Sequence, residues 1–185
     1  MLLRMTAGPR LHELGTFDDQ QAVRVVVEAA AGRRSKLKYQ PALGVFVLHH
    51  VLPAGMAFPW DFGFIPSTLG GDGDPLDALV FADESVPTGT IVPCRLIAVL
   101  QATQSQPGRP VARNDRFLAV ARHGTLYARW RDLDDVPVAM LDQLEHFFVS
   151  YNEQRGVTFA PAGRFGAATA MQVLQQGCSR FRGGA

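Results

Sequence analysis

The stretch Asp72-Gly-Asp74-Pro-Leu-Asp77 places three carboxylates within six residues. It follows the run Phe62-Gly-Phe-Ile-Pro-Ser-Thr-Leu69 and leads directly into Ala78-Leu-Val-Phe81, an apolar segment typical of a buried strand. Neighbouring ionised carboxylates repel one another and raise each other's pKa, and a divalent cation relieves that repulsion. Because carboxylate oxygens are hard ligands, the pattern favours a site for Mg²⁺, Mn²⁺ or Ca²⁺.

A metal-free interpretation of the same stretch is also open. Asp-Gly and Asp-Pro are common turn dipeptides, and an exposed acidic turn needs no ligand. An EF-hand is a poor alternative, because its loop needs an oxygen ligand at the fifth position, where Leu76 stands, and Gly at the sixth, where Asp77 stands. The place of Asp77 at the mouth of a buried strand favours metal binding.

Length and composition predict one soluble domain. The 185 residues are 47% apolar and contain no Ser-, Gly- or charge-rich linker, so we expect a single domain over 1–185 with its core at about 22–176. A formal charge of +1 gives no basic surplus for nucleic acid. Cys94 and Cys178 lack the spacing of a thiolate metal site or a disulfide framework. No signal-like segment or run of about 18 apolar residues is present, so we expect a cytoplasmic protein with no membrane partner.

Hydrophobic patterns predict a small barrel with elaborated loops, followed by two helices. Residues Val138, Leu141, Leu144, Phe148 and Tyr151 recur at three- and four-residue steps and predict an amphipathic helix over 137–154. A second helix is expected over 165–176, with Gly177 ending it. The expected strands are short β-branched or aromatic runs at 23–28, 45–48, 79–81, 91–100, 117–120 and 157–159.

The segment from Phe62 to Val80 resembles the signature region of soluble family I inorganic pyrophosphatases. The likeness continues through 25–28, 32–36, 43–46, 89–95 and 146–151, and covers roughly residues 22 to 155. It implies a mainly β (α+β) fold, an OB-fold-like twisted five-stranded barrel with two C-terminal helices. The implied reaction is Mg²⁺-dependent hydrolysis of diphosphate to phosphate, with Mn²⁺ as a possible substitute. It also implies a homo-oligomer, commonly a hexamer in prokaryotic members.

The resemblance assigns roles to individual residues. Asp72, Asp74 and Asp77 correspond to metal ligands, and Asp74 also to the catalytic carboxylate that contacts the attacking water. Glu28 corresponds to an outer acidic site residue. The substrate-binding positions are occupied by Lys36, His50, Arg116 and Tyr151.

Several positions depart from the family pattern. Lys36-Leu37-Lys38 stands where the family has Lys-Tyr-Glu, so a cation replaces a site carboxylate. His50 stands in place of an Arg, and Asn114 in place of a metal-binding Asp, unless Asp115 takes that place through a shift of one residue. The segment 101–114 is expected to be a loop, and it contains no acid. The remaining departures are Phe58 and Phe62 for Tyr, Gln104 and Ser105 for Asp and Glu, and Asn152 for Lys.

These departures leave three hypotheses. The first is an enzyme with weak diphosphate hydrolysis, or with another phosphoanhydride substrate whose body contacts Phe58, Phe62 and the changed segment at 101–114. The second is a catalytically degenerate module that binds a phosphate ligand through cations such as Lys36 and Lys38. The third is a structural partner that assembles with an authentic pyrophosphatase. Because the acidic turn is complete but its opposing carboxylates are missing, we expect one Mg²⁺ rather than a full set.

Overall fold

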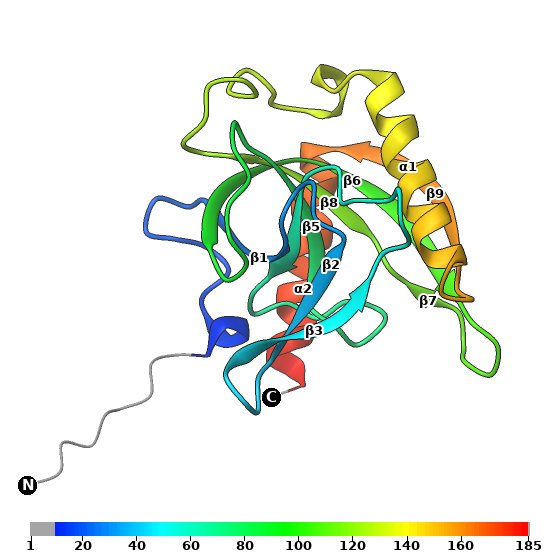
Figure 1. Ribbon diagram of the computed structural model, residues 1–185. Helices are drawn as coiled ribbons and strands as arrows, with labels where there is room; N and C mark the ends of the chain where they lie inside the picture. Colours follow the sequence, from blue (N-terminus) through cyan, green and yellow to red (C-terminus); the bar gives the residue numbers. More distant parts are fainter. Residues whose placement is uncertain (1–9, 185) are drawn as a thin grey trace, which may run out of the picture.

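The computed structural model describes residues 10–184, and its centre is a closed, twisted β-barrel (Figure 1). Five strands form the ring: β1 (Val23–Ala29), β4 (Asp61–Ile65), β5 (Leu76–Phe81), β8 (Arg116–Ala121) and β6 (Ile91–Ser105). Each pairs with the next in this order, and β6 pairs with β1 to close the ring. Only the β5–β8 pair of the ring is parallel. The predicted five-stranded barrel is therefore confirmed.

The barrel strands are buried on both faces. Along β5, Ala78 and Val80 belong to one apolar cluster, and Leu79 and Phe81 belong to another. This division follows the two-residue period of a strand, in which successive side chains point to opposite faces. Such strands appear in the sequence as continuous apolar runs, which is why several of them could be located without the structure.

One helix covers each apolar cluster. Helix α1 (Val138–Glu153) packs Leu141, Leu144 and Phe148 into the cluster that contains Leu79 and Phe81, which confirms the amphipathic prediction. Helix α2 (Ala167–Gly183) packs Ala170, Val173 and Leu174 into the other. Short 3₁₀ turns lie at η1 (Leu11–Glu13) and η2 (Leu133–Asp135). No helix within residues 10–184 is long and apolar enough to span a membrane.

The expected end of the second helix at Gly177 is wrong. The helix continues to Gly183, and Gly177 lies buried within it. A Cβ at this position would lie 2.5 Å from Leu76 Cδ1, so any side chain there would have to displace the end of the Leu76 side chain where α2 lies close to β5. The backbone carbonyl of Gly177 also accepts a hydrogen bond from Leu69 N at 3.1 Å. Gly177 therefore fixes α2 against the segment that leads into the acidic turn.

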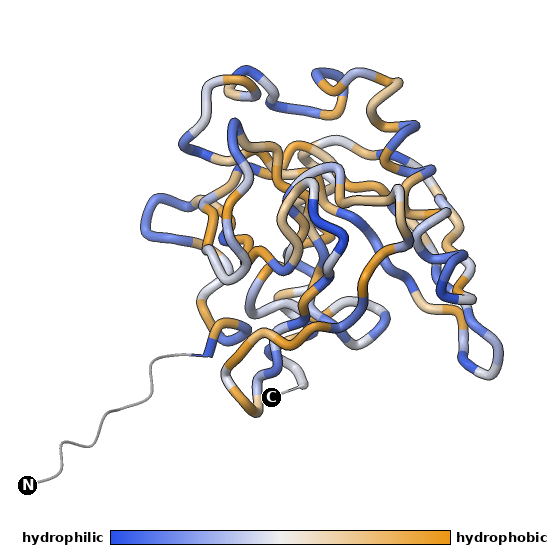
Figure 2. Tube along the Cα trace, in the orientation of Figure 1, coloured by the Kyte–Doolittle hydropathy of each residue, from blue (hydrophilic) through white to orange (hydrophobic). Residues whose placement is uncertain are grey.

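Outside the ring, β2 (Ser35–Gln40) and β3 (Val45–Val51) form a separate two-stranded sheet. Several hydrophobic residues of β3 are exposed, and the strand is coloured largely as hydrophobic in Figure 2. Strand β9 (Thr158–Gly166) pairs with the long second half of β6. The short β7 (Ala112–Arg113) pairs with Thr103 and Gln104, so the expected loop over 101–114 is partly a β-hairpin.

Strand β4 was not among the expected strands. It contains Gly63, where a Cβ would lie 1.9 Å from the backbone oxygen of Val26 on β1. Only glycine allows the two backbones to approach this closely. Strand β2 was also missed, because Lys36 and Lys38 alternate with Leu37 and Tyr39 and give it a polar composition.

Candidate active site

A cavity of about 550 Å³ brings most of the predicted site residues together. Its walls come from the acidic turn, the sheet of β2 and β3, the barrel strands and the end of α1. The predicted residues that line it are Glu28, Lys36, Asp72, Asp74, Asp77, Arg116 and Tyr151. Residues that are more than 100 positions apart in the sequence thus face one space.

The acidic turn has a defined backbone conformation. Gly73 has a φ of 87°, in the left-handed region that glycine adopts readily. Asp72 Oδ1 accepts a hydrogen bond from Asp74 N at 3.2 Å, and Gly70 N donates to the Asp74 carbonyl at 2.7 Å. Leu76 N then donates to Thr68 Oγ1 at 2.9 Å, where β5 begins. The turn dipeptides therefore form a real turn, and its carboxylates face the cavity.

Asp77 forms an ion pair with Arg116. The two residues are register partners on the parallel strands β5 and β8, and Arg116 Nη1 lies 2.8 Å from Asp77 Oδ2. The Arg116 side chain is only 4% exposed, and its guanidinium lies over the rings of Phe62, Phe148 and Phe159. Its Nη1 also donates to the Asp115 carbonyl at 3.0 Å. Arg116 is therefore held rigidly beside one of the predicted metal ligands.

Lys38 pairs with Asp74. Its Nζ lies 2.7 Å from both carboxylate oxygens of Asp74, and both side chains are partly exposed at the mouth of the cavity. Because side chains alternate along a strand, Lys36 projects from β2 on the same face as Lys38. Lys36 Nζ lies 4.0 Å from Glu28 Oε2 and 4.5 Å from the centre of the Phe62 ring. Strand β2 thus supplies two ammonium groups to the cavity.

The cavity shifts the pKa of several of these groups. Burial raises the pKa of Glu28, and Lys36 only partly reverses that effect. Burial alone would lower the pKa of Lys36, but Asp77, Tyr151 and Glu28 together raise it above its ordinary value. Desolvation by the surrounding walls, followed by the charge of Asp77, raises the pKa of Asp72. The cavity therefore favours the cationic form of Lys36 and makes the charge on Asp72 less favourable than it is in water.

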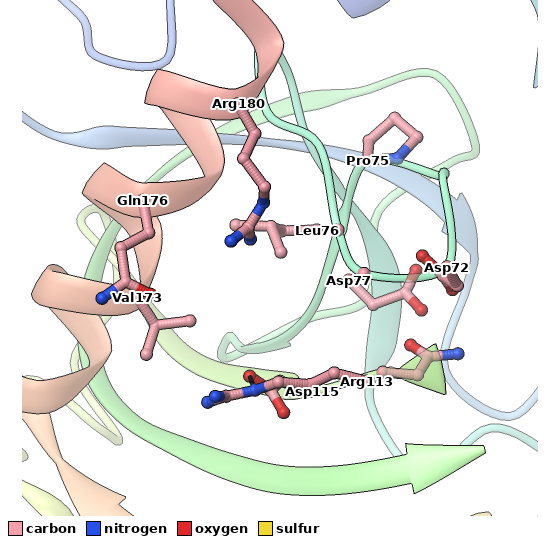
Figure 3. Close-up of a pocket in the computed structure, with 12 residues that line it drawn as sticks. Asp72, Pro75, Leu76, Asp77, Arg113, Asp115, Val173, Gln176 and Arg180 are labelled. Atoms are coloured by element: carbon pink, nitrogen blue, oxygen red, sulfur yellow. Dashed lines mark hydrogen bonds and ion pairs between the residues drawn. The ribbon is translucent and has the colours of Figure 1, made fainter. Parts of the chain in front are cut away.

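Asp72 and Asp77 are the candidate ligands for one cation. Asp72 and Asp77 lie side by side in Figure 3, where the acidic turn faces α2 across a smaller cavity of about 130 Å³. Asp115 also lines this smaller cavity, but its carboxylate accepts from Arg113 Nε at 2.7 Å and from Ala102 N at 3.2 Å. Both of its carboxylate oxygens therefore already accept a hydrogen bond from this chain. Within residues 10–184, no group of three or more His, Cys, Asp or Glu side chains is arranged to hold a metal.

His50 and Phe58 stand apart from the large cavity. His49 lines it, whereas His50 packs against the Tyr151 ring at 5.3 Å between centroids and does not line it. Phe58 is 1% exposed and stacks beneath Phe62, which does reach the cavity. Of the two phenylalanines expected to touch a substrate, only Phe62 is placed to do so.

Arg155 and Arg109 line the cavity but were not identified from the sequence. Arg155 lies in the turn that follows α1, two residues past the end of the helix, and its guanidinium lies 5.5 Å from the centre of the Tyr151 ring. Gln104 and Asn114 also line the cavity, joined by a 2.7 Å hydrogen bond from Asn114 Nδ2 to Gln104 Oε1. Gln104 and Asn114, which stand where carboxylates are expected in the family, therefore face the site as two hydrogen-bonded amides.

A closed barrel whose cavity combines four carboxylates with five Lys and Arg side chains defines a protein suited to a multiply charged anion such as a polyphosphate. The comparisons with known proteins agree with this class. The family model described as inorganic pyrophosphatase matches residues 25–182, and the chain belongs to this family.

Two relatives and one solved structure match over at least 92% of their own length. The inorganic pyrophosphatase of Corynebacterium efficiens is 37% identical over 162 residues, which are 87% of this chain and 99% of that protein. The inorganic pyrophosphatase of Thermus thermophilus is 30% identical over 166 residues, covering 88% and 92%. A crystal structure of the Thermus thermophilus pyrophosphatase superposes with a TM-score of 0.85 at 28% identity, covering 94% of this chain and 99% of that one.

Proposed function

We propose that this protein hydrolyses inorganic diphosphate to two phosphates. One observation carries the proposal: a chain of the pyrophosphatase family brings Asp72, Asp74 and Asp77 into one cavity with Lys36, Lys38 and Arg116. Ammonium and guanidinium groups are suited to phosphate oxygens, and a positioned carboxylate can accept a proton from an attacking water.

The surroundings of each residue suggest its role in hydrolysis. Lys36 and Arg116, whose side chains are only 16% and 4% exposed, supply preorganised positive charge to a bound diphosphate. Asp74 is the candidate proton acceptor, since its side chain is 56% exposed and reachable by water. Tyr151, which lines the cavity from α1, is the candidate neutral contact to a phosphate oxygen.

Mg²⁺ is the proposed cofactor, with Mn²⁺ as a substitute. Asp72 and Asp77 would hold one ion, which when bound supplies positive charge and lowers the pKa of a coordinated water. Loss of one preorganised charge-stabilising group typically slows a reaction by ~10²- to 10³-fold. Because amides stand at positions where relatives are expected to carry carboxylates, we propose weak turnover or a preference for another phosphoanhydride.

Phosphate release from diphosphate, measured with Mg²⁺ and with Mn²⁺, tests the proposal through the Asp74→Asn variant. We expect a metal-dependent rate in the wild type and a loss of at least about 10²-fold in Asp74→Asn, because the amide cannot accept the proton. Asp134→Asn is the matched control, since Asp134 is exposed and lies outside the cavity. Equal, near-blank rates in all three preparations would rule out diphosphate hydrolysis and favour a module that binds phosphate without turnover.

We also propose that the chain forms one domain, lies in the cytoplasm and assembles as a homo-oligomer, up to a hexamer. Membership of the pyrophosphatase family supports all three. A mass in solution equal to the 20.1 kDa of one chain, measured by light scattering, would contradict the oligomer.

A further inference from the structure

Two carboxylates of the acidic turn already hold a cation from this chain. Lys38 reaches Asp74 from β2, and Arg116 reaches Asp77 from β8, at distances of 2.7 and 2.8 Å. These are the distances of charge-assisted hydrogen bonds. Each cation thus occupies a side of the carboxylate that a divalent ion would have to approach.

The charge balance of the whole cavity also disfavours the binding of several divalent ions. Five Lys and Arg side chains line it against four carboxylates: Lys36, Lys38, Arg109, Arg116 and Arg155 against Glu28, Asp72, Asp74 and Asp77. Such a cavity is close to neutral before any metal enters. Each divalent ion added beyond the first would be repelled by fixed positive charges a few ångströms away.

We propose that Lys38 and Arg116 are built-in counter-cations. They take the place of part of the divalent charge, so that the site binds at most one divalent ion, and it binds a diphosphate-like anion directly through its side chains. The proposal deepens the proposed function, on which it rests only for the class of anion. Its metal-binding test does not depend on turnover.

The two counter-cations differ in what a substitution would disturb. Arg116 is buried among three aromatic rings, so its removal would alter the packing of the barrel. Lys38 and Asp74 are 38% and 56% exposed at the cavity mouth. Lys38→Met keeps the length of the chain and removes the charge, and Lys38→Glu introduces a further carboxylate. Arg129→Met is the matched control, because Arg129 is exposed and lies outside the cavity.

Mn²⁺ binding, followed by electron paramagnetic resonance of the free ion, measures the number and affinity of the sites. We expect the wild type to bind no more than one Mn²⁺. Removal of one positive charge beside the carboxylates of the site should tighten binding of a divalent ion about tenfold in Lys38→Met. Lys38→Glu should bind tighter still, and Arg129→Met should bind as the wild type does. Thermal unfolding without metal checks that each variant is folded, and Lys38→Gln replaces Lys38→Met should that variant fail to fold.

Methylene bisphosphonate, a diphosphate analogue that is not hydrolysed, tests the second half of the proposal by calorimetry in the presence of EDTA. We expect it to bind the metal-free wild type and to bind Lys38→Met at least several-fold more weakly. Two or more Mn²⁺ sites in the wild type, or equal Mn²⁺ affinity in wild type and Lys38→Met, would overturn the counter-cation role. No binding of the analogue without metal would do the same. If the Mn²⁺ results are as expected but no phosphate is released from diphosphate, only the proposed hydrolysis would be overturned.

Discussion

The three aspartates of one short turn have three different surroundings. Asp77 is paired with a buried guanidinium, Asp74 is paired with an exposed ammonium, and Asp72 has no ion pair closer than 4 Å among the described residues. Burial and the neighbouring charge of Asp77 raise the pKa of Asp72. Identical residue types in one turn are therefore prepared for different roles by the strands that face them.

The environment of His50 predicts how the stability of the fold changes at acidic pH. Its Nδ1 lies 2.7 Å from His49 Nδ1, and its Nε2 is buried without a hydrogen-bond partner in the described part of the chain. Burial, together with the charges of Arg155, Lys36 and His49, lowers the pKa of His50 to about 4. Between that value and the ordinary pKa of about 6.5, the unfolded chain binds the proton and the folded chain does not. The stabilising effect of neutral His50 should therefore be lost as the pH falls from about 6.5 to about 4.

Urea unfolding at several pH values measures this effect. We expect the free energy of unfolding of the wild type to fall across that pH window by more than that of His50→Gln, with a difference in slope of at most one proton. The difference between the two proteins at pH 8, where both side chains are neutral, is the reference. Parallel curves from pH 8 to pH 4 would contradict the depressed pKa.

At the residue scale, the sequence predicted which charged side chains belong to the site, but not which of them form ion pairs. Asp72, Asp74, Asp77 and Lys36 meet in one cavity as expected. The Lys38–Asp74 pair joins positions 36 residues apart, so it depends on how β2 lies over the acidic turn and no local pattern encodes it. Substitution of a family Glu by Lys38 was visible in the sequence, but its consequence for Asp74 required the structure.

At the element scale, strands that are continuous apolar runs were located from the sequence, whereas a strand with alternating lysines and a strand interrupted by glycine were missed. Strands β5, β6 and β8 are apolar runs and were located from the sequence. Strand β2 alternates Lys with apolar residues because one of its faces lines the cavity, and β4 is interrupted by Gly63 for the approach to β1. The missed strands are thus those that carry a site or a tight backbone contact.

Gly177 provides a prediction for the contact between α2 and β5. A Cβ there would lie 2.5 Å from Leu76 Cδ1 and 3.2 Å from Leu76 Cγ, and the Leu76 side chain, which is itself buried, would have to shift. Overpacking of this kind typically costs ~1–3 kcal/mol, of which the better helix propensity of Ala offsets up to ~1 kcal/mol. Gly177→Ala should therefore lower the free energy of unfolding, measured in urea, by up to about 2 kcal/mol. Gly183→Ala, with no atom within 4 Å of the added Cβ, is the control and should not be destabilised.

At the scale of the whole molecule, the two apolar clusters are coupled through shared strands. Alternate residues of β8 contribute to both, since Leu118 and Val120 lie in one cluster and Phe117 and Ala119 in the other. Loss of either cluster would expose one face of the same strand, and the strand pairing would lose its support. The barrel therefore cannot separate into a part covered by α1 and a part covered by α2.

This coupling predicts a single cooperative unfolding transition. Trp60 and Trp130 pack against the cluster under α1, so their fluorescence reports on that side of the barrel. Far-UV circular dichroism reports on both helices, including α2 on the other side. If the chain is one domain, the two signals should give the same midpoint and the same slope in urea. Gly177→Ala, which disturbs packing only on the α2 side, should move both midpoints by the same amount. A shift confined to the dichroism signal would show that the two sides unfold independently.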